Sequence, residues 1–286
     1  MADTNIFKCI GNEEESIPDS ILEELGLSYE ELNRYDSNIV TLSKALKKYK
    51  NNSFCRLPFC HTVEAETFGS TVIFDHKFGN RIGGYAINDM NSIEDIKEFD
   101  LSKGRIAEVL KAIDILKKDG EDIIFDITGP ITIATSIIDS QLFFRSIRKN
   151  TEKVNKLLEL IEDSTVTYIL EGIKNGADVI SFADPAGTLD IVGPKIYKDL
   201  AGKTTYNILK RVEGKLDDSF VHLCGKTSTS LEAIGLLGFE KIKVEGQDYF
   251  DMIRNIKNER KDIKSIGHWC LKSKIKNNEL VICKLI

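Results

Sequence analysis

From residue 53 onward, short apolar runs rich in β-branched and aromatic residues alternate with longer amphipathic stretches. Such runs predict strands, and apolar residues at every third or fourth position predict helices. A chain that repeats strand and helix in this way favours a parallel sheet covered by helices on both faces. The predicted strands are FCRLPFC (54–60), STVIFD (70–75), DIIFDITGP (122–130), DVISFADPAG (178–187), FVHLCG (220–225), KIKVEG (241–246) and IKSIGHWC (263–270), with ELVICKLI (279–286) as an eighth strand or an edge.

The alternation fits either a closed α/β barrel or an open, doubly wound sheet. No predicted strand is followed by a G-x-G-x-x-G turn, and this argues against the dinucleotide-binding kind of open sheet. The length of 286 residues and the number of strands favour a (β/α)8 TIM barrel, which typically needs about 250 residues. Helices are predicted at 102–118, 151–174, 195–213, 226–237 and 248–260.

The first 52 residues have a different pattern and predict a helical extension. ILEELG ends at Gly26, and Ser28-Tyr-Glu-Glu has the form of a capping box that opens a second helix. No low-complexity linker divides the chain. The expected organisation is therefore an N-terminal helical extension (1–52) packed on a TIM-barrel domain (53–286).

The composition of the chain limits the kinds of molecule that it can bind and the compartment in which it is expected. Hydrophobic residues make up 42% of the chain and charged residues 29%, as in globular proteins. The net charge of -6 argues against nucleic-acid binding, and no run approaches the roughly 18 apolar residues of a membrane span. The first residues lack the pattern of a secretory signal. Six cysteines scattered through a long chain suit reduced thiols, so a cytoplasmic location is expected.

Most predicted strands end in polar residues. In a TIM barrel the C-terminal ends of the strands form the rim of the active site, so these residues are expected to meet there. The sequence thus predicts a pocket lined by carboxylates, imidazoles and thiols. The residues concerned are His61, Glu64, Asp126, Asp184, His222, Cys224, Glu245, His268 and Cys270.

His222 and Cys224 stand two residues apart in a predicted strand and therefore point to the same side. Cys270 ends another predicted strand. One imidazole and two thiolates suit zinc, and three protein ligands leave a fourth position open, as in catalytic zinc sites. Two alternatives remain: a buried imidazole with two core cysteines, or His268 as a ligand in place of Cys270, although adjacent strand residues face opposite sides.

Several segments resemble the uroporphyrinogen decarboxylase superfamily, and more narrowly its corrinoid-dependent methyltransferase branch. The resemblance runs from about residue 53 to residue 286. GHWC stands in place of the usual Pro-Gly-Cys-Gly, and the interval from Cys224 to Cys270 is shorter than in enzymes that act on coenzyme M. This shortened form resembles the methyltransferase components of O-demethylase systems. The matching segments are HTVEAETFG (61–69), FDITGP (125–130), ISFADPAG (180–187), FVHLCG (220–225) and GHWC (267–270).

The resemblance implies a zinc-dependent methyltransferase whose zinc ligands are His222, Cys224 and Cys270. The enzyme would move a methyl group from an aryl methyl ether, such as vanillate or veratrole, to the cob(I)amide of a separate corrinoid protein. Zinc would act as a Lewis acid on the donor oxygen. The same ligands also suit the alternative acceptor, a thiol that takes a methyl group from a methylcorrinoid, as in coenzyme M-type enzymes.

Two other classes of protein are alternatives. A metal-free uroporphyrinogen-type decarboxylase would need an arginine-rich pocket, but only Arg56 and Arg81 lie near predicted strand ends. A non-enzymatic corrinoid or metal carrier would bind its ligand without turnover. The sequence leaves open whether the chain forms a homodimer.

Three more residues are candidates for catalysis. Glu245 ends the strand after His222, and is either a fourth zinc ligand or an exposed charge. Asp184 is either a residue that orients substrate or moves a proton, or a turn and helix-cap residue. His61 is a candidate for substrate contact.

Overall fold

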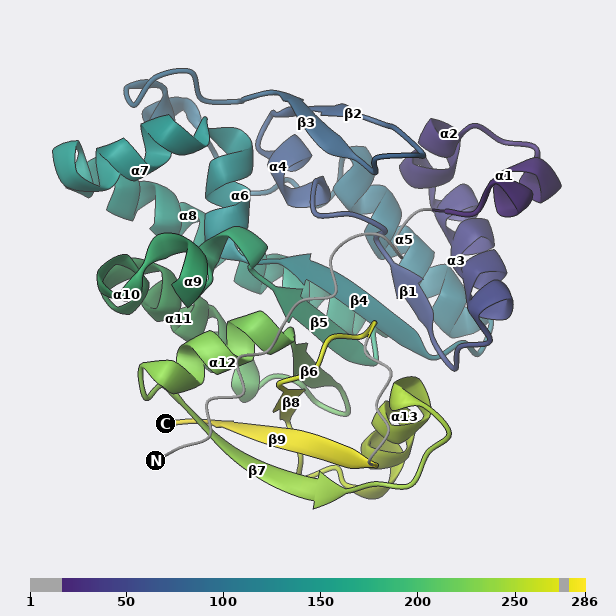
Figure 1. Cartoon of the computed structure of the whole chain (residues 1–286). Coiled ribbons are helices and arrows are strands. Elements are labelled where there is room, and N and C mark those ends of the chain that lie inside the picture. Colours follow the sequence, from purple (N-terminus) through teal and green to yellow (C-terminus); the bar gives the residue numbers. More distant parts are fainter. Residues whose placement is uncertain (1–16, 273–277) are drawn as a thin grey trace.

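The computed structural model describes residues 17–272 and 278–286. The protein has an α/β fold in which one large mixed sheet carries helices on both of its faces (Figure 1). In the described part of the chain, the strand order of this sheet is β1-β4-β5-β6-β8-β9-β7. Its strands are β1 (Cys55–Leu57), β4 (Ile123–Thr128), β5 (Val179–Ala183), β6 (Phe220–Leu223), β8 (Ser265–Gly267), β9 (Glu279–Leu285) and β7 (Leu237–Lys243).

The first five strands of this order are parallel, as the alternating pattern predicts. On β4, β5 and β6 the outer face of the sheet is apolar, and Phe125, Phe182 and Leu223 are among its fully buried residues. These side chains join one continuous core with α5 (Gly104–Lys118), α8 (Thr151–Lys174) and α11 (Gly202–Glu213). The predicted helices at 102–118, 151–174 and 195–213 therefore cover this face.

The inner face of the sheet changes from apolar to polar along the strands. Near the strand starts, Ile124, Val179 and Phe220 pack against the apolar side of α13 (Tyr249–Glu259). Two residues further along, the same face carries Asp126 on β4 and His222 on β6. The apolar layer thus forms a floor, and polar groups lie above it.

One predicted strand lies outside the large sheet. The segment 70–75 contributes β2 (Thr71–Ile73), which pairs antiparallel with β3 (Arg81–Gly84) in a separate two-stranded sheet. In Figure 1 this ribbon lies over α4, away from the large sheet. The burial of β2 alternates between exposed and half-buried, whereas a strand of a covered parallel sheet is buried on both faces.

Two other predicted strands, 241–246 and 279–286, enter the large sheet but run antiparallel to their partners. β9 pairs antiparallel with β8 on one side and with β7 on the other. A parallel crossover needs a dozen or more residues, usually with a helix, and the connection from Gly267 to Glu279 is too short for one. β9 therefore returns beside β8 in the opposite direction.

Strand pairing does not link β7 back to β1 within residues 17–272 and 278–286. The α/β class is therefore established, whereas the closed eight-stranded ring expected from the sequence is not seen in this part of the chain. Both edges, β1 and β7, lie at opposite ends of the sheet in Figure 1.

The N-terminal region is helical from Asp19 to Lys50, in three helices: α1 (Asp19–Leu25), α2 (Tyr29–Arg34) and α3 (Asp36–Lys50). The predicted capping box is confirmed, because the Ser28 hydroxyl accepts from the Glu31 N–H and the Glu31 carboxylate accepts from the Ser28 N–H. α3 packs against β1 and α5. The first 16 residues of the predicted extension lie outside the described residues.

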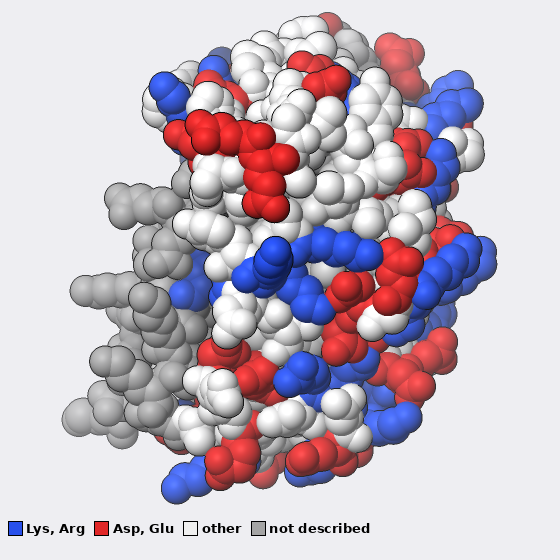
Figure 2. All heavy atoms as spheres, turned by 90° about the vertical axis from the view of Figure 1, so that its right-hand side faces the viewer, with Lys and Arg blue, Asp and Glu red and all other residues white. Residues whose placement is uncertain are grey.

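Shorter helices complete the connections. No helix in the described part of the chain is long and apolar enough to cross a bilayer. Basic and acidic side chains lie next to one another over the face that carries α1, α3 and α13 (Figure 2). The remaining elements are α4 (Val63–Thr67), η1 (Ser92–Asp95), α6 (Pro130–Ile137), α7 (Ser140–Lys149), η2 (Pro185–Gly187), α9 (Leu189–Val192), α10 (Pro194–Ile196), the π-helical η3 (Tyr197–Ala201) and α12 (Gly225–Ala233).

Candidate functional site

A cavity of about 610 Å³ opens beside β1, between α3, the start of α13 and the inner face of the sheet. Its wall combines aromatic side chains with charged and polar ones. Such a mixture suits a small-molecule site, where apolar surface holds the ligand and a few polar groups orient it. The residues that matter below are Arg56, Cys60, His61, Asp126 and Tyr249.

The sheet register places three polar residues in one row on the inner face. Asp126 pairs with Ser181, and Ser181 pairs with His222, across β4, β5 and β6. Side chains of paired residues on neighbouring strands point to the same side of a sheet. The row therefore connects the cavity wall at Asp126 with His222.

Asp126 is held by a cation from the neighbouring strand. Arg56 on β1 donates from Nε to Oδ2 of Asp126 over 2.5 Å. Burial raises the pKa of Asp126 above its ordinary value, while Arg56 and Ser181 oppose that shift. A carboxylate and a guanidinium thus share the wall of the cavity, each partly neutralising the other.

His222 is buried with its ring unsatisfied. Neither ring nitrogen has a hydrogen-bond partner among the described residues, although the backbone of Trp269 approaches the ring. Burial, helped by the charge of Arg56, lowers the pKa of His222 to about 3. The imidazole is therefore neutral at physiological pH and offers a nitrogen lone pair, which is the form that binds a metal.

The two other predicted zinc ligands lie around the same aromatic ring as His222. Tyr249 packs edge-on against His222, with the ring centroids 5.7 Å apart. Burial, and then the nearby thiols of Cys283, Cys270 and Cys224, raise the pKa of Tyr249 well above its ordinary value, so the three cysteines lie in the neighbourhood of this residue. As the side chains stand, no three His, Cys, Asp or Glu residues of the described chain are close enough together to hold a metal ion.

His268, the alternative ligand, is turned toward a different neighbour. Its backbone adopts a left-handed conformation with φ of 64°, and its N–H donates to the Ser228 hydroxyl over 2.8 Å. Nε2 of His268 lies 3.1 Å from Glu232, and its ring packs against Phe239. These contacts direct the ring toward α12 and β7.

His61 lines the cavity, as the sequence predicts for a substrate contact. Nδ1 of His61 lies 3.4 Å from the Thr128 hydroxyl. Thr128 in turn donates from both its N–H and its hydroxyl to the carboxylate of Glu64, which is fully buried. The sequence placed Glu64 among the residues expected to line the pocket, but Glu64 does not line this cavity, and its link to the end of β4 is set by tertiary packing.

Asp184 has a structural set of partners. Its carboxylate accepts from the N–H and hydroxyl of Thr132 and from the N–H of Ile131, at the start of α6. It is buried and is not among the residues that line the cavity. These contacts favour the alternative interpretation of Asp184 as a helix-cap residue.

Glu245 lies just after β7, on the far side of β9 from the parallel strands. Its side chain is exposed, and it does not line the cavity. Its backbone carbonyl accepts from the Asn255 side chain over 2.8 Å. This position favours the interpretation of Glu245 as an exposed charge.

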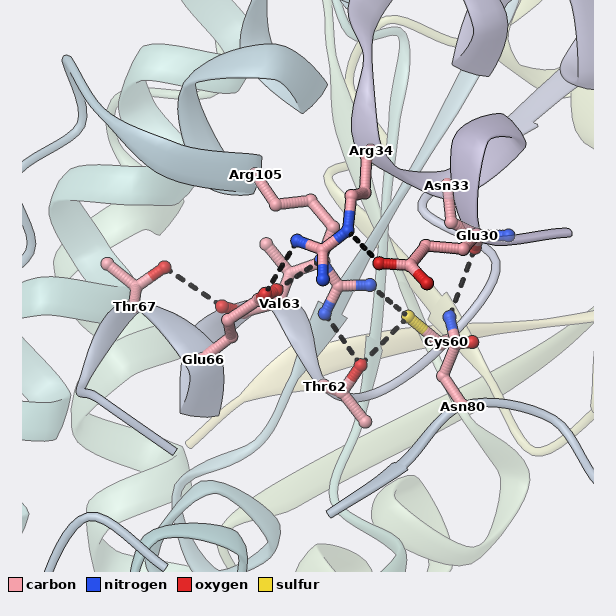
Figure 3. Close-up of polar contacts among 10 residues, drawn as sticks. All are labelled: Glu30, Asn33, Arg34, Cys60, Thr62, Val63, Glu66, Thr67, Asn80 and Arg105. Atoms are coloured by element: carbon pink, nitrogen blue, oxygen red, sulfur yellow. Dashed lines mark hydrogen bonds and ion pairs between the residues drawn. The ribbon is translucent and has the colours of Figure 1, made fainter. Parts of the chain in front are cut away.

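A buried arginine, which the sequence analysis missed, stabilises the wall beside Cys60 (Figure 3). Arg105 on α5 donates to Glu66 over 2.5 Å, to the Thr62 hydroxyl over 2.7 Å and to the Cys60 sulfur over 3.4 Å. Its side chain is only 2% exposed. A buried charge needs such partners, so this cluster holds the segment that carries Cys60 and His61 in place.

Comparison with known proteins identifies the family. The family model for uroporphyrinogen decarboxylase (URO-D) matches residues 19–275. The chain belongs to this family. A solved methyltransferase from Methanosarcina mazei has the same fold, with a TM-score of 0.64 and 23% sequence identity, over 72% of this chain and 60% of that one.

Curated relatives place the URO-D family chain near one branch of the family. Methylcobamide:CoM methyltransferase MtbA of Methanosarcina acetivorans is 28% identical over 228 residues, which are 78% of this chain and 67% of that protein. Methylcobamide:CoM methyltransferase MtaA of Methanosarcina barkeri is 27% identical over 231 residues, or 79% of this chain and 67% of that protein. The chain thus spans about two thirds of the length of these relatives. The likeness to the corrinoid methyltransferase branch is confirmed, whereas these relatives do not support the narrower likeness to O-demethylase components.

Proposed function

We propose that this URO-D family chain is a methyltransferase that moves a methyl group from a methylated corrinoid protein to a small thiol. The proposal is supported by its relation to enzymes named for methylcobamide and CoM. These names favour the thiol alternative over the aryl methyl ether that the sequence analysis preferred. The corrinoid is proposed to arrive on a separate partner protein.

Zinc is proposed to be held by His222, Cys224 and Cys270. The observation that carries this step is the buried, neutral imidazole of His222, whose ring nitrogens have no partner in the described chain. A buried polar atom of this kind calls for a missing ion, water or ligand. The thiols of Cys224 and Cys270 lie around the same tyrosine, and the three side chains would have to draw together on binding. When bound there, zinc would supply Lewis acidity that lowers the pKa of a thiol substrate.

The chain's own residues then bind and orient the acceptor. The aromatic part of the cavity wall, with Phe59 and Phe250, would exclude water from the reacting sulfur. Arg56, held by Asp126, places a positive charge in the wall near His222. His61, in the loop that follows β1, lines the same cavity and is proposed to contact the acceptor.

A closed (β/α)8 barrel is proposed as well, and structural rather than catalytic roles are proposed for Asp184 and Glu245. In a closed barrel, the inner face described above would become the interior, and the row from Asp126 to His222 would face its mouth. The contacts of Asp184 and the exposure of Glu245 favour structural roles for both.

The direct test supplies the purified, zinc-loaded chain with methylcobalamin and a panel of thiols, including 2-mercaptoethanol and coenzyme M. Loss of the methyl-cobalt absorbance and formation of the thioether are expected, and chelation of zinc should abolish both. In a parallel reaction, cob(I)alamin is offered with veratrole. Methyl-cobalt formation from veratrole without thiol methylation would instead support the ether demethylase. Thiol methylation at full rate in metal-free protein would refute the zinc step.

A further inference from the structure

Unsatisfied polar atoms gather where His222 meets Tyr249. Buried side-chain atoms without a hydrogen-bond partner include both ring nitrogens of His222, the hydroxyl of Tyr249 and Nε1 of Trp269. Native interiors leave few polar groups unpaired, because each unpaired buried group destabilises the fold. Tyr249 packs on the His222 ring and the Trp269 backbone approaches the same ring, so these residues lie together at a place that a polar ligand would complete.

Tyr249 is the member of this group that also lines the cavity. It is the first residue of α13, whose start is fixed by the Asp248 carboxylate accepting from the Asp251 N–H over 2.9 Å. The residue is 1% exposed and packs its ring on His222. Its place between the cavity and the proposed zinc ligands is therefore set by the helix.

The chemistry of a phenol limits the kind of partner that the Tyr249 hydroxyl can bind. A protonated hydroxyl donates one hydrogen bond, so its natural partner at this place is an electron-rich acceptor. A buried tyrosine hydroxyl ordinarily makes a hydrogen bond to another residue. The Tyr249 hydroxyl makes none to the described residues. In the proposed reaction, the electron-rich atom next to His222, Cys224 and Cys270 is the sulfur of the acceptor.

We propose that the Tyr249 hydroxyl donates a hydrogen bond to the sulfur of the thiol acceptor and so positions it for methyl transfer, an inference that rests on the proposed function. The hydroxyl keeps its proton throughout, and no bond to it breaks. A sulfur lone pair that does not accept this bond forms the new sulfur–carbon bond as the cobalt–carbon bond of the methylated corrinoid substrate breaks. The electron pair of that bond stays on cobalt, and the thiol proton is released to water. Tyr249 is thus a residue that positions the sulfur of the acceptor.

The test compares wild type with Tyr249→Phe, which removes the hydroxyl and keeps the ring against His222. The zinc-loaded full chain is titrated with 2-mercaptoethanol, and binding is followed by the fluorescence of Trp269, the only tryptophan of the sequence. Loss of a hydrogen bond to a charged acceptor weakens binding about tenfold. We expect Kd and KM for the thiol to rise by about that factor, with bound zinc and the unfolding midpoint unchanged.

Tyr168→Phe is the matched control. Tyr168 is also fully buried with an unpaired hydroxyl, but it packs edge-on against Phe125 in the core on the outer face of the sheet. This variant should bind 2-mercaptoethanol as wild type does.

The other possible outcomes overturn either the role of Tyr249 alone or the proposed function as well. Equal thiol affinity of Y249F and wild type overturns the role of Tyr249 while leaving methyl transfer intact. Weaker zinc binding with unchanged thiol affinity assigns the hydroxyl to the protein's own sulfurs and likewise overturns it. A wild-type chain that neither binds nor methylates any thiol overturns the proposed function and this inference together.

Discussion

Arg56 and Asp126 join two neighbouring strands through a single ion pair on the cavity wall, with Nε of Arg56 2.5 Å from Oδ2 of Asp126. The two side chains differ in exposure, since 31% of Arg56 but only 6% of Asp126 is accessible. The charge of the more buried Asp126 therefore depends on Arg56 for compensation more than the charge of Arg56 depends on Asp126. The pair brings a charge into the site without leaving a buried carboxylate uncompensated.

Arg56→Met should destabilise the protein by about 2 kcal/mol near neutral pH, because it leaves the Asp126 charge buried and unpaired. Burial already raises the pKa of Asp126, and removing Arg56 raises it further. The folded variant then keeps a proton that the unfolded chain has lost, so stability falls as pH rises from the ordinary range of a carboxyl toward the raised pKa. Urea midpoints at pH 5 and pH 8 measure this.

A second substitution isolates the cause. Asp126→Asn added to Arg56→Met removes the unpaired charge and should recover most of the loss at pH 8. If the single variant lost the same stability at both pH values, Asp126 would not be the group responsible.

Replacement of any proposed zinc ligand should release the metal. His222→Ala, Cys224→Ser and Cys270→Ser are each expected to lower zinc affinity by more than the roughly 10–100-fold that follows loss of an outer hydrogen bond. Cys283→Ser is the matched control, because this buried thiol also lies near Tyr249 but is not a proposed ligand. The zinc content of each variant after dialysis tests this assignment. Equal zinc loss in the Cys283 variant would argue against His222, Cys224 and Cys270 as the ligands.

The cysteines should differ in their reaction with iodoacetamide. Burial raises the pKa of Cys55 to about 11 and that of Cys283 to about 12. Since the thiolate is the reactive form, both should remain unmodified at pH 8.5 until the protein unfolds. Half-buried Cys60 on the cavity wall should react in the native state. Peptide mapping by mass spectrometry reads each site, and early labelling of Cys283 would contradict the packing of β9.

Asp184→Ala should destabilise the fold by about 2–4 kcal/mol, because Thr132 and the N–H of Ile131 lose their acceptor inside the protein. Asp184→Asn should cost less, since it keeps one acceptor oxygen and removes a buried charge. Burial raises the pKa of Asp184 from 3.8, so the folded protein holds a proton that the unfolded chain has lost. The advantage of wild type over Asp184→Asn should therefore shrink as pH rises above about 4.

Denaturant titrations from pH 4 to pH 7 follow that difference. If the stability of wild type relative to Asp184→Asn grew as the pH rose over this range, the folded state would favour the ionised carboxyl of Asp184. A large loss of methyl transfer in a stable Asp184→Asn protein would return Asp184 to the list of catalytic candidates.

The sequence was sufficient for the features that depend on local pattern. The parallel strands β1, β4, β5, β6 and β8, the long helices and the Ser28 capping box all follow from periodicity and cap residues within a short window. The spacing of His222 and Cys224 and their family likeness were likewise visible in the sequence, but the expectation that both lie in one strand was wrong, because β6 ends at Leu223 and Cys224 is the N-cap of α12. Each of these signals is carried by residues that are neighbours in the chain.

The direction of each strand and its pairing partners could not be predicted from local sequence pattern. The apolar runs at 241–246 and 279–286 look like the parallel strands, yet β7 and β9 pair antiparallel because the short connection after β8 forces the chain to return. The run at 70–75 is similar in composition, but β2 lies in a separate ribbon. The length of connections and the available neighbours decided these pairings.

What the sequence determined is therefore the set of elements and the chemistry of the candidate ligands. The tertiary structure alone decided which groups share one environment: Arg56 with Asp126, Glu64 with Thr128, Asp184 with the start of α6, and Tyr249 with His222. The physical reason is that burial and cross-strand register act between residues far apart in the chain, and local periodicity carries no information about such distances.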